Sequence, residues 1–158
     1  MTDIPDLLPV EPGYKNVLRA RLALVWLALT GGALFLGYTL DDEMRFAMLL
    51  PAVVFLAGML VVAIVPGRIY RRLGYGLSER LLQVVRGWLF HTDTVVPLVR
   101  VQHLDVVRGP FDKLFGTASL VLHTAGTHNS IVTLPGLAPE KAAAMRDIIR
   151  EHVRTDFA

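Results

Sequence analysis

Two long uncharged apolar segments limit what this chain can fold into. They span residues 22–40 and 46–65, and neither contains Asp, Glu, Lys or Arg. A helix needs about 20 apolar residues, each adding 1.5 Å of rise, to cross a hydrocarbon core of roughly 30 Å. Only the pentapeptide 41–45 separates the two segments. The sequence therefore predicts a hairpin of two antiparallel transmembrane helices, with both chain ends on one side of the membrane.

Basic residues flank one side of this predicted hairpin. Lys and Arg close to the ends of membrane spans favour the cytoplasmic side, whereas acidic residues count for little. We therefore expect a multi-pass protein of the inner (plasma) membrane, with both termini cytoplasmic and residues 41–45 outside. A cleaved signal peptide is disfavoured because a second complete span follows the first. The flanking residues are Arg19, Arg21, Arg68, Arg71 and Arg72.

The remaining residues form two further segments. Residues 1–21 are rich in proline and acidic residues at their start, which predicts an extended, mobile N-terminal cytoplasmic arm. Residues 66–158 are enough for one small globular domain, with twelve Lys and Arg residues against eight Asp and Glu residues. The chain has no cysteine, so disulfides and thiolate metal sites are excluded.

The pattern after residue 66 is typical of short strands separated by turns. We expect Pro66-Gly67 to end the second helix, and Phe111–Phe115 to form one helical turn. Residues 139–153 have an apolar stripe at helical spacing and predict an amphipathic C-terminal helix. The predicted strands cover 69–77, 80–86, 88–97, 101–107, 117–124 and 130–134.

This order of elements predicts an α+β membrane protein. Six or seven antiparallel strands closed by one helix is the order expected of a pleckstrin-homology-like (PH-like) barrel or sandwich. The two-helix hairpin would precede that domain in the chain.

The sequence also resembles a known family. Residues 95–126 read VVPLVRVQHLDVVRGPFDKLFGTASLVLHTAG and are similar to the bacterial PH-like domain of the YdbS-like membrane proteins. The likeness extends from Arg68 to the final helix, and the preceding hairpin fits the same family. The resemblance implies a PH-like barrel at the inner membrane surface and a second, longer membrane protein with PH-like domains as partner. It implies no catalytic activity and no cofactor.

Five cations are candidates for contact with lipid headgroups. The negative surface of the cytoplasmic leaflet attracts basic segments next to a span. The alternative is that the first three mark topology and that the other two are solvated charges at a turn. The five residues are Arg68, Arg71, Arg72, Arg108 and Lys113.

A polar cluster on one predicted strand is the second candidate. It consists of Arg100, Gln102, His103 and Asp105, and it is either a structural hydrogen-bonding group or a partner surface. A catalytic His–Asp pair needs a nucleophile and an oxyanion donor, which no motif supplies. His123 and His128 lack a carboxylate or cysteine nearby in sequence, so we expect no metal site. The modest positive charge also argues against nucleic-acid binding.

Small residues in the two spans are the third candidate. Gly31, Gly32, Gly37 and Gly58 let helix backbones approach closely, either within the hairpin or against the helices of a partner. The partner would be another membrane protein or a second copy of this chain. The sequence thus favours a membrane-anchored PH-like interaction module in a hetero-oligomeric complex. The alternative is a domain that binds anionic lipid headgroups, and an enzyme is not expected.

Overall fold

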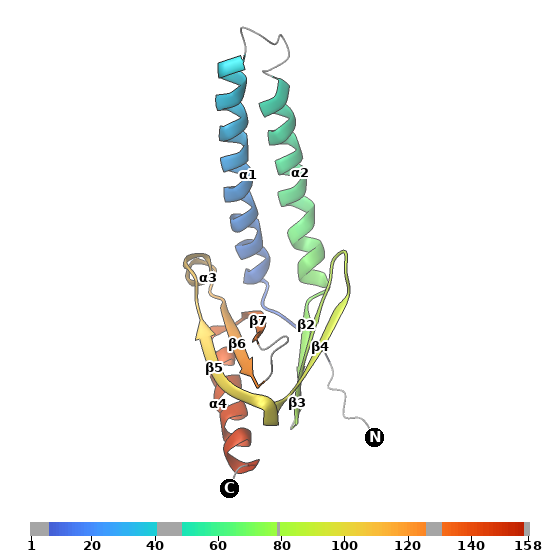
Figure 1. Cartoon of the computed structure of the whole chain (residues 1–158), viewed down its shortest axis with the longest axis vertical. Helices are drawn as coiled ribbons and strands as arrows, with labels where there is room; N and C mark the ends of the chain where they lie inside the picture. The colour runs from blue at the N-terminus through green and yellow to red at the C-terminus, as the bar shows by residue number, and fades with distance from the viewer. Residues whose placement is uncertain (1–6, 41–48, 79, 126–130, 157–158) are drawn as a thin grey trace. The chain divides into compact units, whose positions relative to one another are not determined.

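The computed structural model describes residues 7–40, 49–78, 80–125 and 131–156. It divides into two units, the helical residues 15–67 and a domain made of residues 1–14 together with 68–158. Its elements in chain order are β1 (Leu8–Pro9), α1 (Gly13–Leu40), α2 (Leu49–Arg71), β2 (Gly74–Leu77), β3 (Leu81–Arg86), β4 (Thr92–Pro97), the 3-10 turn η1 (Leu98–Arg100), β5 (Val101–Val107), α3 (Pro110–Leu114), β6 (Ala118–Thr124), β7 (Ile131–Leu137) and α4 (Pro139–Asp156) (Figure 1).

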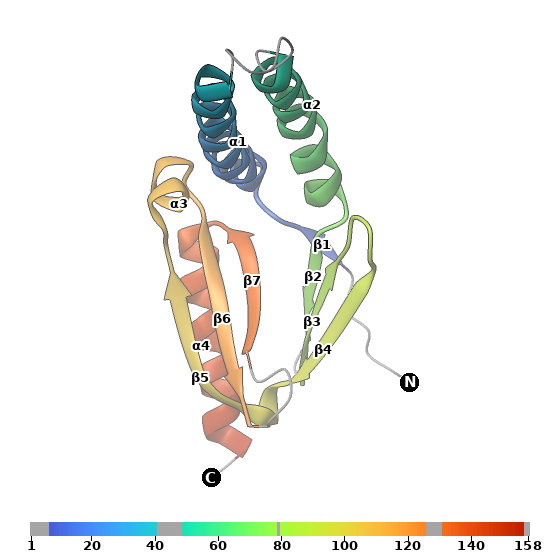
Figure 2. The same cartoon turned by 45° about the horizontal axis from the view of Figure 1, so that its top comes forward.

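Helices α1 and α2 form the predicted hairpin and lie side by side (Figures 1 and 2). Both are long and apolar enough to cross a membrane, and few of the residues in their most apolar windows are buried. That exposure fits lipid-facing helices, because lipid takes the place of a protein core around them. The connecting residues 41–45, which we predict to lie on the non-cytoplasmic side, are not among the described residues.

Both helices extend beyond the apolar segments. α1 begins at Gly13, nine residues before the apolar run, and α2 continues through Pro66 to Arg71. The prediction that Pro66-Gly67 ends the second helix is therefore wrong, as is a strand beginning at Ile69. A proline removes one backbone donor, which can bend a helix without ending it when the flanking turns are otherwise bonded.

The domain contains two antiparallel sheets. The first has the order β1-β2-β3-β4, and the second has the order β5-β6-β7. Side chains alternate along β6 as predicted, because Leu120 and Leu122 are fully buried while Val121 and His123 are half-buried. The short helical turn predicted near Phe111 is confirmed as α3.

The sheets do not close into a barrel in the described part of the chain, which corrects that part of the prediction. Between β4 and β5 the turn η1 interrupts the pairing, and the two sheets diverge from this corner (Figure 2). Arg86 on β3 donates a hydrogen bond to the carbonyl of Thr133 on β7, so a side chain joins the sheets where no strand pairing does.

Helix α4 packs against β5, β6 and η1 (Figure 1). Its apolar stripe is buried at Ala142, Met145 and Ile149. The predicted amphipathic helix is therefore confirmed, and it extends three residues beyond the predicted end. Together with fully buried leucines of both sheets, the stripe forms the core of the domain.

The end of the N-terminal arm is part of the domain and not a mobile tail. Leu8 pairs with Tyr75 and Pro9 with Gly74, so the arm adds strand β1 to the edge of β2. Val10 is buried, and the N–H of Glu11 donates to the carbonyl of Gly136 at 2.7 Å. The structure thus groups residues 7–14 with the domain that begins at residue 68.

Gly136 holds the arm at a position where a side chain would not fit. Its φ is +77°, and a Cβ there would lie 2.7 Å from Cγ of Tyr14. We expect Gly136→Ala to lower the free energy of unfolding by roughly 1–3 kcal/mol, the usual range for a strained backbone position. Thermal unfolding in mild detergent measures this change. Gly116→Ala is the matched control, because Gly116 has φ +66° with nothing within 4 Å, and its unfolding temperature should fall less.

Candidate functional site

Three of the candidate cations lie at the end of α2. Arg68, Arg71 and Arg72 are exposed, and Nη1 of Arg72 donates to the carbonyl of Trp88 at 3.1 Å. This bond ties the end of α2 to the turn between β3 and β4. Two of these cations line a groove of about 500 Å³, whose lining is Leu7, Leu8, Pro9, Arg71, Arg72, Leu73, Gly74, Val85 and His91.

Of the other two cations, one precedes α3 and one lies within it. Nε of Arg108 donates to the carbonyl of Thr117 at 3.3 Å, and Lys113 is exposed on α3 itself. The loop is held from inside by Asp112, which is only 3% exposed. Its carboxylate accepts from the hydroxyl of Thr117 at 2.9 Å and from the N–H of Gly109 at 3.1 Å. The five cations therefore belong to two separate groups.

Strand pairing brings together a polar cluster that sequence spacing does not show. His103 on β5 pairs with His123 on β6, so both rings lie on the same face as Asp105. Nε2 of His103 is 3.0 Å from one oxygen of Asp105, and Nε2 of His123 is 3.5 Å from the other. The three side chains are 38–68% exposed, so any charge on them is screened by water.

The other two predicted members of this cluster lie outside the regular pairing of β5 with β6. Gln102 falls at a register shift between Val101 and His103, and Arg100 belongs to η1. The carbonyl of Arg100 accepts from the N–H of Ala125 at 2.9 Å. His128 is outside the described residues, among which no group of three or more His, Cys, Asp or Glu side chains is placed to hold a metal ion.

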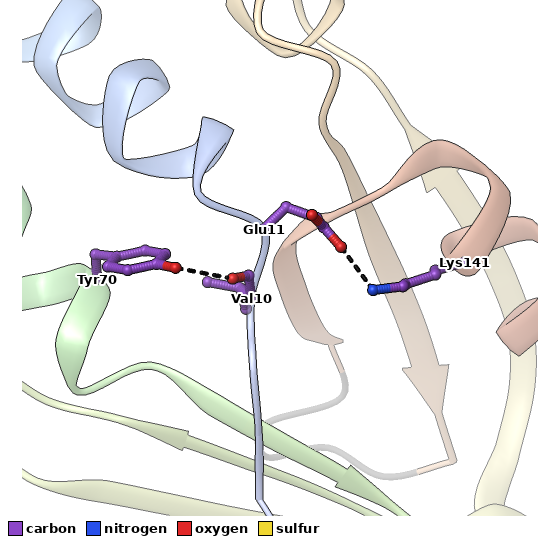
Figure 3. Close-up of polar contacts among 4 residues, drawn as sticks. All are labelled: Val10, Glu11, Tyr70 and Lys141. Atoms are coloured by element: carbon purple, nitrogen blue, oxygen red, sulfur yellow. Dashed lines mark hydrogen bonds and ion pairs between the residues drawn. The ribbon is translucent and has the colours of Figure 1, made fainter.

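Two hydrogen bonds that join the arm to distant parts of the domain were not predicted. Nζ of Lys141 donates to a carboxylate oxygen of Glu11 at 2.7 Å, and the hydroxyl of Tyr70 donates to the carbonyl of Val10 at 3.3 Å (Figure 3). The hydrogen bond to Glu11, together with the attraction of its charge, raises the pKa of Lys141 above its ordinary value of 10.5. These contacts join segments up to 130 positions apart, and no local motif reports them.

A polar pair in the first sheet, with one buried and one exposed member, was also missed. Gln83 on β3 is 7% exposed, and its Nε2 donates to both carboxylate oxygens of Asp93 on β4 at 2.8–2.9 Å. All four central residues of β3 are buried, so alternation does not single out Gln83, and only the pairing of β3 with β4 reveals its partner.

The hairpin carries a groove of its own, of about 400 Å³. Gly58 is one of its lining residues, and a Cβ there would lie 3.0 Å from the side chain of Trp26. Of the other predicted packing residues, Gly37 is buried, whereas Gly31 and Gly32 have nothing within 4 Å of a Cβ position. The full lining is Arg19, Ala23, Trp26, Leu27, Thr30, Phe55, Gly58, Met59, Val62 and Ala63.

The model of the bacterial PH domain family matches residues 20–153, a range that includes α2, strands β2 to β7 and most of α1 and α4. The chain belongs to this bacterial PH domain family. The UPF0699 transmembrane protein YdbS of Bacillus subtilis (strain 168) is 34% identical over 150 residues, covering 95% of this chain and 90% of the relative. The resemblance drawn from the sequence is confirmed, and the protein is a membrane protein with transmembrane helices. No solved structure matches the chain significantly.

The Lys141–Glu11 contact predicts a pH dependence. Because the folded-state pKa of Lys141 is raised, its contribution to stability is complete below pH 10.5 and is lost as pH rises through the folded pKa. We expect Glu11→Gln to return that pKa toward 10.5, as measured by NMR titration of the lysine side chain. Glu140→Gln on the neighbouring residue is the control. An equal shift in both variants would contradict a specific tie to Glu11.

Proposed function

We propose that the protein is a membrane-anchored PH-like interaction module that acts as a subunit or scaffold of a hetero-oligomeric complex in the inner membrane. The groove of the hairpin supports this proposal most directly. Its lining is largely apolar, with small residues on both helices. In lipid, helices associate by close packing, and small residues at the interface permit that approach. A partner helix would replace lipid along Ala23, Gly58 and Ala63.

The partner we propose is a second membrane protein with PH-like domains, as the family resemblance implies. A second copy of this chain is the alternative occupant. The basic residues next to the spans favour cytoplasmic termini, and hence a complex whose PH-like domains face the cytoplasm.

Filling the groove tests this function. We expect Ala23→Leu combined with Ala63→Leu to reduce recovery of the partner at least tenfold when the tagged chain is purified in mild detergent. The two larger side chains would occupy the space that a partner helix needs. Leucine at either position remains compatible with contact to lipid. The measurement is quantitative mass spectrometry of the co-purified membrane proteins.

The matched control is Ala28→Leu combined with Ala57→Leu. Both positions are exposed on the same two helices but do not line the groove. Full recovery with the control and loss with the groove variant supports the proposal. Equal recovery with both variants, or purification of a lone monomer at native expression, would contradict it.

A second candidate function is recognition of anionic lipid headgroups. The observation that favours it is the groove lined by Arg71, Arg72 and His91, next to the end of a transmembrane helix. A phosphate group fits such a site because guanidinium groups bind it with two parallel hydrogen bonds.

This second function predicts retained lipid. We expect native mass spectrometry of the full chain to show bound phosphatidylglycerol that is lost in Arg71→Gln combined with Arg72→Gln. Arg100→Gln combined with Arg150→Gln serves as the charge-matched control. Retention of the lipid in the first variant would exclude a headgroup site here.

A further inference from the structure

Three apolar side chains of the domain are exposed far beyond the rest. Leu89, Phe90 and Leu114 are 74%, 84% and 73% exposed, whereas no other large apolar side chain of the described domain exceeds 59%. Two side chains of the membrane-spanning helix α1 have similar exposed fractions, with Phe35 at 72% and Tyr38 at 77%. Single exposed apolar residues are common on soluble surfaces, but three at one end of a domain need an explanation.

These side chains are presented by ordered turns. In the turn between β3 and β4, a Cβ on Gly87 would lie 2.5 Å from the carbonyl oxygen of Phe90, so only glycine permits this tight path. In the second turn the buried Asp112 accepts hydrogen bonds from Gly109 and Thr117 and so holds α3, which carries Leu114. We call these two segments, residues 88–90 and 110–114, the apolar tips.

The apolar tips lie at the same end of the domain. β4 begins after the first tip and β5 ends before the second, so both tips lie away from the η1 corner that joins β4 to β5. Both views show α3 and the β3–β4 turn at one end of the domain (Figures 1 and 2).

The chain enters the domain from its spans at this same end. The carbonyl of Trp88 in the first tip accepts from Arg72, which follows the last residue of the second apolar run by seven positions. Seven helical residues correspond to about 10 Å of rise. Beside the second tip, a Cβ on Gly13, the first residue of α1, would lie 3.1 Å from Cγ2 of Thr117. Each tip is thus next to one of the two covalent connections to the membrane.

We propose that the apolar tips insert into the interfacial layer of the bilayer that holds the protein's own spans. Leu and Phe transfer favourably out of water, and Trp prefers the headgroup level, where its ring is apolar and its N–H is hydrated. Arg72, Arg108 and Lys113 surround the tips and can extend their charged ends to the phosphates. A bilayer is the occupant that the covalent connections favour, because it is already within reach of both tips.

This inference goes beyond the proposed function. It requires neither a partner protein nor a specific headgroup, since insertion of apolar side chains does not depend on anionic lipid. It assigns the domain a second attachment to the membrane, in addition to the hairpin.

The absence of native cysteine makes a direct test possible. Full-length single-cysteine variants Leu89→Cys and Leu114→Cys carry a nitroxide spin label and are reconstituted into phosphatidylcholine vesicles, with and without phosphatidylglycerol. We expect both labels to be accessible to oxygen and protected from a water-soluble nickel complex, in comparison with the control label described next. Val99→Cys in η1, 52% exposed at the other end of β4, is the matched control and should stay accessible to nickel.

Each result decides the proposal. Immersion of both tip labels in neutral as well as anionic vesicles supports it. Nickel access at Leu89→Cys or Leu114→Cys equal to that of Val99→Cys would overturn it, and so would immersion that occurs only in anionic vesicles. Because no second protein is present, failure here is separate from failure of the complex proposed above.

Discussion

The need to pair every backbone polar group inside the bilayer is the constraint on which the rest of this structure depends. Hydrocarbon offers no hydrogen-bonding partner, so an uncharged segment of this length becomes a helix. Two such helices in succession return the chain to the side from which it started. The return allows Leu8, which precedes both spans, to pair with Tyr75, which follows them. The domain is therefore built from two segments that the hairpin separates in sequence.

The N-terminal segment completes the domain in two ways. As strand β1 it covers one edge of β2, and unpaired sheet edges are the usual sites of unwanted association. Beyond the strand, Glu11 contacts both Gly136, at the end of the second sheet, and Lys141 on α4. An arm of eight described residues thus touches the first sheet, the second sheet and the helix. These contacts matter more in a small domain, whose core alone gives limited stability.

The elements that were predicted correctly are those marked by patterns among neighbouring residues. β3, β5 and β6 lie within one residue of the predicted bounds, because alternation and turn residues mark them, and α4 begins at the predicted Pro139. The pattern was less informative where long-range contacts decide the structure. Strand β1 has two residues, which is too few to show an alternating pattern. Pro66, a residue that usually ends a helix, lies inside α2.

The candidate sites show the same division. Asp105 and His103 were recognisable from sequence, but His123 joins them only through the pairing of β5 with β6. The residues Leu89 and Phe90 were assigned to a strand, because apolar content is the main strand signal. Their position in a turn, and hence their exposure, requires the structure.

The two-segment construction of the domain also links folding to membrane insertion. During synthesis the arm appears first, and the strand that it pairs with is made only after both spans have been completed. If one span failed to insert, the arm and the rest of the domain would lie on opposite sides of the membrane, and the edge of β2 would stay open. The domain can therefore fold completely only in a chain with both spans inserted, because only then can β1 pair with β2.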